Sequence, residues 1–269
     1  MLLSKNEKRF LILGFAVLML LASFVDLPLT KALYNPASPW GLFFKHFASF
    51  PGMTLGAMSF CVLTMSDPVN KNLISINRIF NGILMLVFGF SLVYTPVLSM
   101  GIIQPAYGII GIVFVLIIAY LVSKLPVARK QSLRKYALIG AITKVGSMAA
   151  VNLLKIVWGR ARYWTFVGND ALFTPWYRPH GLTLSENFKS FPSGHSQFAT
   201  VSLLATMLPD VFASLKGKQR GFLLVSILWI VMVMLSRMIL GQHFLSDTVV
   251  GVAITVGVFA ITKKYILKL

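Results

Sequence analysis

The segment S236-R-M-I-L-G-Q-H-F-L-S-D247 decides the fold, because it sets polar and charged residues between two apolar runs. The run W229-I-V-M-V-M-L235 precedes it, and the run V249-V-G-V-A-I-T-V256 follows it. Glycine commonly ends helices, so Gly241 at the centre of the segment indicates a break. The segment therefore predicts two apolar helices joined by a short polar turn, with the arginine ending one helix and the histidine beginning the next.

Composition places the whole chain in a membrane. Of its 269 residues, 57% are hydrophobic and only 12% are charged, and the mean hydropathy is +0.80. Soluble domains carry roughly 25% charged residues. Backbone groups inside hydrocarbon must be hydrogen-bonded within the protein, so the spanning segments are expected to be helices. We predict an all-α, polytopic transmembrane helical bundle.

The chain is strongly basic, with 25 Lys and Arg against 7 Asp and Glu and a formal charge of +18. Because these cations lie between apolar runs and form no solvated domain, they favour anchoring to anionic lipid over binding to nucleic acid. The single cysteine, Cys61, excludes an intrachain disulfide. The lipid bilayer is thus an expected partner and nucleic acid is not, while the oligomeric state stays open.

About eight apolar runs approach the ~20 residues that span a bilayer. The stretch W40-G-L-F-F-K-H-F47 before the second run is a candidate interfacial helix. The first run has a basic flank, as signal peptides do, but it is longer than a signal core and lacks an A-x-A site, so we expect it to be retained. The runs lie near residues 10–27, 50–66, 79–99, 106–122, 137–157, 194–212, 221–240 and 245–262.

Basic residues occur in every second loop. Cytoplasmic loops of membrane proteins carry an excess of Lys and Arg, so this alternation predicts that both termini are cytoplasmic. The residues that set the orientation are Lys5, Lys8, Arg9, Lys71, Arg78, Lys124, Arg129, Lys130, Arg134, Lys135, Lys216, Lys218, Arg220, Lys263, Lys264 and Lys268.

The loop at residues 158–192 breaks this pattern, because it carries cations on the outer side, where they are normally scarce. These are Arg160, Arg162, Arg178 and Lys189. An anionic substrate would explain them. The loop is also aromatic: it is interpreted either as an interfacial aromatic belt or as a lid over a lipid headgroup, with Arg178 or His180 touching that headgroup.

A first polar cluster is K155-I-V-W-G-R-A-R162. Seven residues are about two helical turns, so Lys155 and Arg162 would share a face if the helix continued, roughly 10 Å apart along its axis. Two such cations could bracket an anion. The simpler alternative is a pair of cations that extend to the membrane interface.

A second cluster is F191-P-S-G-H195, at the start of the sixth run. Pro192 and Ser193 favour a helix start, and Gly194 allows close approach of the backbone to a ligand. Free amide groups at a helix start favour anions, which would place His195 beside a bound anion. The alternative is an ordinary helix cap with an interfacial histidine.

The third cluster is the segment quoted first. His243 and Asp247 are four residues apart, hence on one helical face, so the carboxylate could fix the imidazole tautomer and leave the other ring nitrogen nucleophilic. The alternative is an Arg237–Asp247 pair that anchors two helix ends.

Together the clusters predict phosphoryl transfer on the outer side. Lys155, Arg162, Arg237 and the helix-start amides would neutralise the phosphoryl oxygens. His243 would attack the phosphorus, His195 would protonate the leaving oxygen, and Asp247 would orient His243. The sequence shows no set of metal ligands with suitable spacing, so we expect neither a metal nor another cofactor.

The motifs K155-x6-R162, P192-S-G-H195 and S236-R-x5-H243-x3-D247 resemble the signature of the type 2 phosphatidic acid phosphatase superfamily, in the order found there. The first motif departs from the family pattern, because Tyr163 follows Arg162 where the family usually has proline. The resemblance implies a helical-bundle phosphatase that works without metal through a phosphohistidine.

The resemblance also assigns roles. It implies that His243 is the nucleophile, Asp247 its partner and His195 the general acid, with the phosphate held by Lys155, Arg162, Ser193, Gly194 and Arg237. Residues 136–269, the last four spans, resemble the catalytic core. Residues 1–135 would be additional N-terminal transmembrane helices, to which the sequence assigns no role.

We therefore expect a hydrolase of lipid phosphates or pyrophosphates in a bacterial plasma membrane, active at the outer face. The sequence does not separate undecaprenyl pyrophosphate, phosphatidylglycerol phosphate and phosphatidic acid as substrates. A phosphotransferase, which passes the phosphoryl group to an acceptor hydroxyl, is one alternative. A transporter is another, but transporters usually place polar sites near the bilayer middle, where Lys144 is the main ionisable residue here.

Overall fold

A computed structural model describes residues 5–68 and 70–268, and it confirms the all-α prediction. The chain is 78% helical, and no strand occurs in the described residues. The longer helices are α1 (Lys5–Leu33), α2 (Pro39–Phe47), α3 (Phe50–Met65), α4 (Ile74–Ser99), α5 (Ala106–Ser123), α6 (Val127–Trp158), α9 (Gln219–Ile239) and α10 (Leu245–Ile266).

Seven stretches within the described residues are helical, long and apolar enough to cross a membrane. The candidate interfacial helix forms α2, which begins with Pro39 and is capped by Ser38, whose hydroxyl accepts from Gly41 N at 3.1 Å. Because α2 leads almost directly into α3, the two together make one spanning stretch, Pro39–Met65.

The sixth expected span, residues 194–212, is not one continuous α-helix. It is divided into α7 (Gly194–Thr200), the 3₁₀-helix η5 (Val201–Met207) and α8 (Leu208–Val211). A rise of 1.5 Å per residue in α-helix and 2.0 Å in 3₁₀-helix gives these segments a combined length of roughly 30 Å, about the thickness of the hydrocarbon core. The segment is therefore long enough to cross in mixed helical form.

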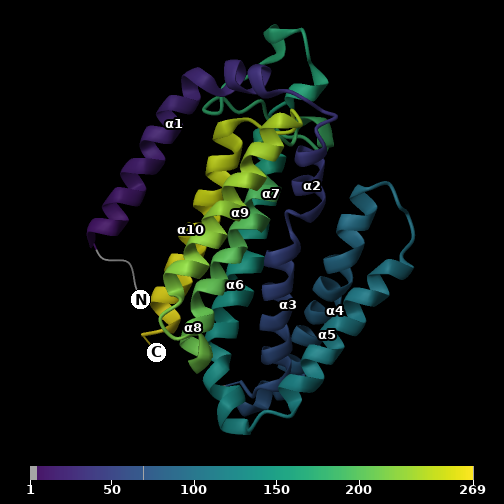
Figure 1. The fold of residues 1–269 in the computed structure, drawn as a ribbon, viewed down its shortest axis with the longest axis vertical. Coiled ribbons are helices and arrows are strands. Elements are labelled where there is room, and N and C mark those ends of the chain that lie inside the picture. The colour runs from purple at the N-terminus through teal and green to yellow at the C-terminus, as the bar shows by residue number, and fades with distance from the viewer. Residues whose placement is uncertain (1–4, 69, 269) are drawn as a thin grey trace.

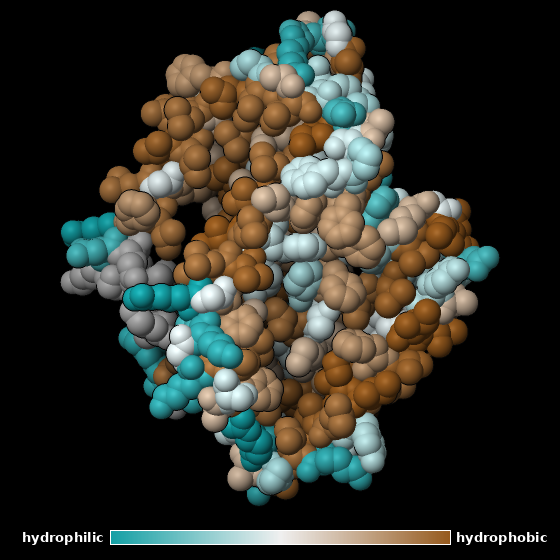
Figure 2. Space-filling model, viewed as in Figure 1, coloured by the Kyte–Doolittle hydropathy of each residue, from teal (hydrophilic) through white to brown (hydrophobic). Residues whose placement is uncertain are grey.

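The helices form an elongated bundle (Figure 1). Helices α6, α7, α9 and α10 pack together, α3 packs against α6, and α4 and α5 form a hairpin beside α3. Helix α1 leans on α10 and diverges from the bundle toward its own start. Brown apolar side chains cover large parts of the visible flank, as expected of a protein surrounded by lipid, and teal hydrophilic ones lie at the top, at the bottom and along the lower left side (Figure 2).

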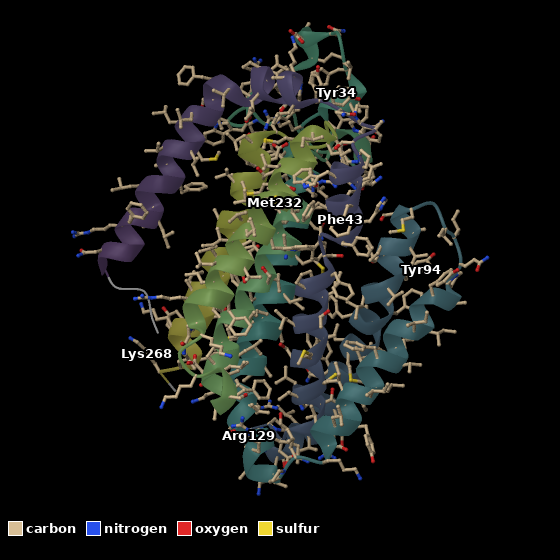
Figure 3. The ribbon with its side chains drawn as sticks, in the orientation of Figure 1. Tyr34, Phe43, Tyr94, Arg129, Met232 and Lys268 are labelled. Carbon is tan, nitrogen blue, oxygen red and sulfur yellow. The ribbon has the colours of Figure 1, made fainter. Side chains whose placement is uncertain are left out.

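The two ends of the bundle differ in what they hold. The loops between α3 and α4, α5 and α6, and α8 and α9 lie at one end, with Arg129 and Lys268 toward it (Figure 3). The loop at residues 158–192, the α9–α10 turn and Tyr34 lie at the other end. The bundle thus separates the basic loops from the three motifs.

Close backbone packing positions the motif end. A Cβ atom added to Gly251 of α10 would lie 2.4 Å from the carbonyl oxygen of Ser193. The backbone of α10 therefore runs directly against the start of α7, which small residues permit between membrane helices. Ser193 N in turn donates to the Asp247 carbonyl at 2.8 Å. These contacts fix the second motif against the third.

Candidate active site

The three motifs meet around one cavity at the end of the bundle that holds the loop 158–192. The cavity has a volume of about 480 Å³. Five of the side chains that line it are basic or imidazole groups, and one is a carboxylate. The lining residues are Asn152, Lys155, Ile156, Arg162, Glu186, Lys189, Gly194, His195, Phe198 and His243. The cavity therefore presents a concentrated positive potential, suited to an anion.

Lys155 and Arg162 both line this cavity, but not by the expected route. Helix α6 ends at Trp158, because Gly159 adopts a left-handed conformation with φ +60°. The idea that one continuous helix sets the two cations on a single face is therefore wrong. Glycine adopts this conformation at little cost, so the chain turns after α6 and brings Arg162 back over the helix end.

The backbone of Arg162 is extended, with φ −84° and ψ 143°. A residue that precedes proline is held in this same region, so Arg162 keeps the conformation that a family proline would impose. Tyr163 instead contributes its buried ring, which meets Tyr34 edge to face with ring centroids 5.1 Å apart. Aromatic packing thus holds the position where proline is absent.

Glu186, which sequence reasoning missed, occupies the cationic side of the cavity. Arg162 Nε donates to the Glu186 carbonyl at 2.8 Å, and its guanidinium lies 3.4 Å from the Glu186 carboxylate. Lys189 Nζ donates to the same carboxylate at 2.8 Å. The hydrogen bond from Lys189 lowers the pKa of Glu186 below its usual value. The carboxylate is thus charged, and it contacts the cations that an anionic substrate would need.

The second motif forms the expected helix start. Ser193 is the N-cap of α7, and its hydroxyl accepts from Ser196 N at 3.3 Å. Its side chain is buried and does not line the cavity, whereas Gly194 and His195 do. Ser193 therefore shapes the helix start, and the backbone at Gly194 is the part of the motif exposed to a bound group.

His243 lines the cavity, but its closest polar partner differs from the expected one. The Nδ1 atom lies 2.6 Å from the Ser190 carbonyl oxygen and 3.7 Å from Asp247 Oδ2. A carbonyl oxygen only accepts hydrogen bonds, so Nδ1 carries the proton and Nε2 of the neutral ring has a free lone pair. Burial lowers the pKa of His243 to about 3, which keeps the ring neutral at physiological pH.

Asp247 lies behind His243 and outside the cavity lining. Its Oδ2 atom accepts from the Ser190 hydroxyl at 2.5 Å and from Phe244 N at 2.8 Å, and its Oδ1 atom accepts from Arg160 at 2.6 Å. Because Ser190 contacts both Asp247 and His243, it bridges the carboxylate and the imidazole. Ser190 carries no motif signature, and sequence reasoning missed it.

Arg237 is fully buried near the end of α9, next to the turn that carries His243. Its carbonyl oxygen accepts from His243 N at 3.3 Å. Within the described part of the chain, its three guanidinium nitrogens have no hydrogen-bond partner. A buried, unpartnered guanidinium is costly, and Arg237, which was expected in the phosphate pocket, is not among the residues that line the cavity. Gly241 breaks the chain after α9 with φ +64°, as expected.

The candidate lid residues Arg178 and His180 are exposed, and neither lines the cavity. The loop that carries them is anchored to the end of α6. His180 N donates to the Trp158 carbonyl at 2.7 Å, and Thr183 N donates to the Ile156 carbonyl at 2.8 Å. These bonds satisfy carbonyl groups that a helix end leaves free. Arg162, Glu186 and Lys189 are the residues of this loop that line the cavity.

Lys144 lies deeper in α6 and is fully buried. Its ammonium group lies 3.8 Å from the ring centre of Phe198 and 5.3 Å from that of Phe88. Cation–π contact with two rings partly offsets its burial. Because Phe198 also lines the cavity, Lys144 lies beneath the cavity wall rather than in a second site.

Comparison with known protein families gives a match. Residues 135–269 match the PAP2 superfamily, and this range contains all three motifs and half of the chain. Neither a curated protein nor a solved structure matched the chain. The match agrees with the resemblance that the motifs indicate, and the chain therefore belongs to the PAP2 superfamily, whose members are phosphatases.

Proposed function

We propose that the chain hydrolyses lipid phosphates or pyrophosphates through a phosphohistidine on His243, without a metal, at the outer face of the membrane. One observation carries this proposal: the Ser190 carbonyl holds the proton on Nδ1 of His243, and the ring lines a cationic cavity. The unprotonated Nε2 is thereby available as a nucleophile toward phosphorus.

The proposed first step forms a bond from His243 Nε2 to phosphorus and breaks the bond from phosphorus to the leaving oxygen. Lys155 and Arg162 stabilise the charge on the equatorial oxygens. A bound phosphate dianion beside His195 favours its protonated form, so His195 can give a proton to the leaving oxygen. Water then attacks the phosphorus and gives a proton to the neutral His195, and the bond from phosphorus to Nε2 breaks, which releases phosphate and restores His243.

Asp247 acts in this scheme through charge as well as position. The imidazole ring gains positive charge when Nε2 bonds to phosphorus, and a buried carboxylate nearby stabilises that charge. The Ser190 hydroxyl holds Asp247, while the Ser190 carbonyl holds His243. We infer that Ser190 links the two groups, so that the carboxylate and the nucleophile keep a fixed relation during the reaction.

A lipid substrate is supported by the surroundings of the cavity. Leu182 and Leu184 on the loop are 81% and 82% exposed, and Trp164 is 49% exposed. Such side chains at one end of an apolar bundle suit the interface between hydrocarbon and headgroups. The distribution of Lys and Arg along the chain supports the outer face, because the basic loops lie at the end opposite the cavity.

The proposal is tested by phosphate release from a panel of purified lipids by the detergent-solubilised protein, with EDTA present. The panel contains phosphatidic acid, phosphatidylglycerol phosphate and undecaprenyl pyrophosphate. We expect release of free phosphate from at least one lipid and none from His243→Ala. Dependence on added magnesium would contradict the metal-free mechanism, and radiolabel recovered on an acceptor alcohol instead of in free phosphate would indicate a transferase.

A further inference from the structure

Helix α1 lies outside residues 135–269, yet it contributes a buried carboxylate next to the candidate active site. Its residues that face the bundle recur every three or four positions, as on one helical face. Three of these residues are uncharged, as is usual inside a membrane helix, but the fourth, Asp26, is a carboxylate that is only 2% exposed. The buried residues of this face are Met19, Ala22, Asp26 and Thr30. An ionisable residue inside a membrane helix is costly and calls for a partner.

That partner is Arg160, which is 1% exposed and occupies one of the unassigned positions of the first motif. One guanidinium nitrogen, Nη2, lies 3.0 Å from Asp26 Oδ2, and another, Nη1, lies 2.6 Å from Asp247 Oδ1. Arg160 Nε donates to the Thr174 carbonyl at 2.8 Å. A single arginine therefore joins the carboxylate of α1 to the carboxylate behind His243, and the loop 158–192 fixes its orientation.

Ser246 makes a second link between the same groups. Its backbone N donates to Asp26 Oδ1 at 2.9 Å, and its hydroxyl donates to Asp26 Oδ2. Arg160 Nη1 also lies 2.8 Å from this hydroxyl. Because Ser246 immediately precedes Asp247, Asp26 holds the first turn of α10, from which Asp247 projects.

The charges of this buried group have a chemical consequence. Two carboxylates share one guanidinium, so the group carries one net negative charge. If Arg160 paired with Asp247 alone, the two charges would cancel, and Asp247 would stabilise a positive imidazole poorly. Because Asp26 neutralises part of the positive charge of Arg160, net negative potential remains beside His243. The proposed reaction develops positive charge on the His243 ring at this place.

We propose that Asp26 is a positioning residue for the active site, which acts through Arg160 and Ser246 to fix Asp247 and to leave net negative charge beside His243. This inference rests on the proposed function of His243. It assigns to α1 a part in catalysis, although α1 precedes the matched region by about a hundred residues.

The first test compares Asp26→Asn with Asp170→Asn. Asp170 lies on the loop and pairs with Lys31 of α1, so its substitution breaks an exposed contact between the same two elements. We expect Asp26→Asn to lower kcat on the order of tenfold to a hundredfold, the size of loss seen when the hydrogen-bonding partners behind metal ligands are removed, with KM nearly unchanged. Asp170→Asn should keep wild-type kcat. Wild-type kcat in folded Asp26→Asn would overturn the proposal.

The second test distinguishes positioning from a general loss of structure. If Asp26 acts through Asp247, Asp26→Asn should change kcat by less than about twofold in an Asp247→Asn background, because interacting sites are not additive. An equal loss in both backgrounds would contradict the proposal. Asp26→Glu retains the charge but displaces it, so we expect it to recover part of the lost kcat and to fold if Asp26→Asn does not.

A third measurement needs no turnover. In ¹⁵N spectra of histidine-labelled protein, the His243 signal is assigned by its loss in His243→Gln, and its chemical shifts report which ring nitrogen carries the proton. We expect Nδ1–H in wild type and in Asp170→Asn, and altered His243 shifts in Asp26→Asn. Unchanged shifts would overturn the positioning role. If wild type hydrolyses no substrate, the proposed function fails, and this measurement still decides whether Asp26 positions His243.

Discussion

At the scale of single residues, the two histidines have different surroundings, so substitutions of His195 and of His243 should reduce activity in different ways. His243 has its Nδ1 proton fixed by Ser190, whereas His195 is proposed only to protonate the leaving oxygen. A lipid alkoxide needs that proton, and general-acid help is worth roughly 10²–10⁴-fold. A nitrophenolate leaves readily without it. His195→Ala should therefore keep far more activity on nitrophenyl phosphate than on a lipid phosphate.

His243→Ala is the matched comparison, because it should be inactive on both substrates. Asp247→Asn should fall between the two, since His243 remains but its positive charge is poorly stabilised. Initial rates on both substrates for the three variants are the measurement. Equal losses for the two histidine variants on both substrates would refute this division of roles.

The buried His243 also predicts how stability depends on pH. Its pKa is about 3 in the folded protein, below the unfolded value near 6.5. Between these values the unfolded chain binds the extra proton, so stability falls as the pH falls below about 6.5, by up to about 1.4 kcal/mol per pH unit from this group. His243→Gln removes this pH-dependent contribution to stability.

Thermal unfolding of wild type and His243→Gln in detergent, at pH 7 and pH 5, measures this effect. The other three histidines are common to both proteins, so only the difference between them reports on His243. We expect wild type to lose more stability than the variant on acidification. Equal losses would show that His243 is not held neutral in the folded state.

Sequence alone identified the charged residues of the motifs, with Asp247 as the expected partner of His243, but it missed Ser190 and Asp26. Lys155, Arg162, His195 and His243 line one cavity, although Lys155 and Arg162 are separated by the turn at Gly159 and do not share one helical face. Ser190 escaped notice because its carbonyl, which any residue carries, makes the decisive contact. Asp26 escaped because its partner lies 134 positions away, although a carboxylate in an apolar helix was a usable signal.

At the scale of helices and turns, left-handed glycines set where the cations lie. Gly159 ends α6, and a Cβ atom there would lie 2.4 Å from the Gly181 carbonyl oxygen. Gly159→Ala should therefore strain the turn that separates Lys155 from Arg162 and reduce both stability and activity. Gly168 also has positive φ, +85°, but has open space around it, so Gly168→Ala incurs only the conformational cost of roughly 1–2 kcal/mol.

Unfolding temperatures and KM for a soluble phosphate ester in the two glycine variants provide the measurement. We expect a larger loss of stability and a higher KM for Gly159→Ala than for Gly168→Ala. Equal effects would show that close contact with Gly181 has no part in placing Arg162.

Periodicity and length predicted most helices of the chain, because a bilayer demands long apolar segments. The division of residues 194–212 into α7, η5 and α8 was not predictable in this way. A Cβ atom added to Gly52 of α3 would lie 2.4 Å from the Phe198 carbonyl oxygen, so α7 packs closely against α3. Such contacts between distant segments leave no periodic mark in the sequence.

At the scale of the whole molecule, the bundle separates the basic loops from the cavity, and we infer that the cavity faces outward. Single cysteines can test this in a Cys61→Ser background, since Cys61 is the sole native cysteine. Leu184 lies on the loop beside the cavity, and Gln131 lies near the start of α6; both are exposed. In intact cells, an impermeant maleimide should label Leu184→Cys but not Gln131→Cys.

Permeabilised cells provide the control, because both cysteines should then react. Labelling of Gln131→Cys alone in intact cells would reverse the proposed orientation. The experiment bears on function, because an outward cavity can receive only lipids whose phosphate groups are exposed in the outer leaflet.

The most direct test of the central claim is to trap the covalent intermediate. Wild type and His243→Gln are mixed briefly with a ³²P-labelled lipid phosphate and quenched in alkali, in which phosphohistidine survives although acid destroys it. We predict acid-labile label on the peptide that contains His243 in wild type, and none in His243→Gln. Rapid turnover with no labelled protein, or label that persists in His243→Gln, would contradict a phosphohistidine mechanism at this residue.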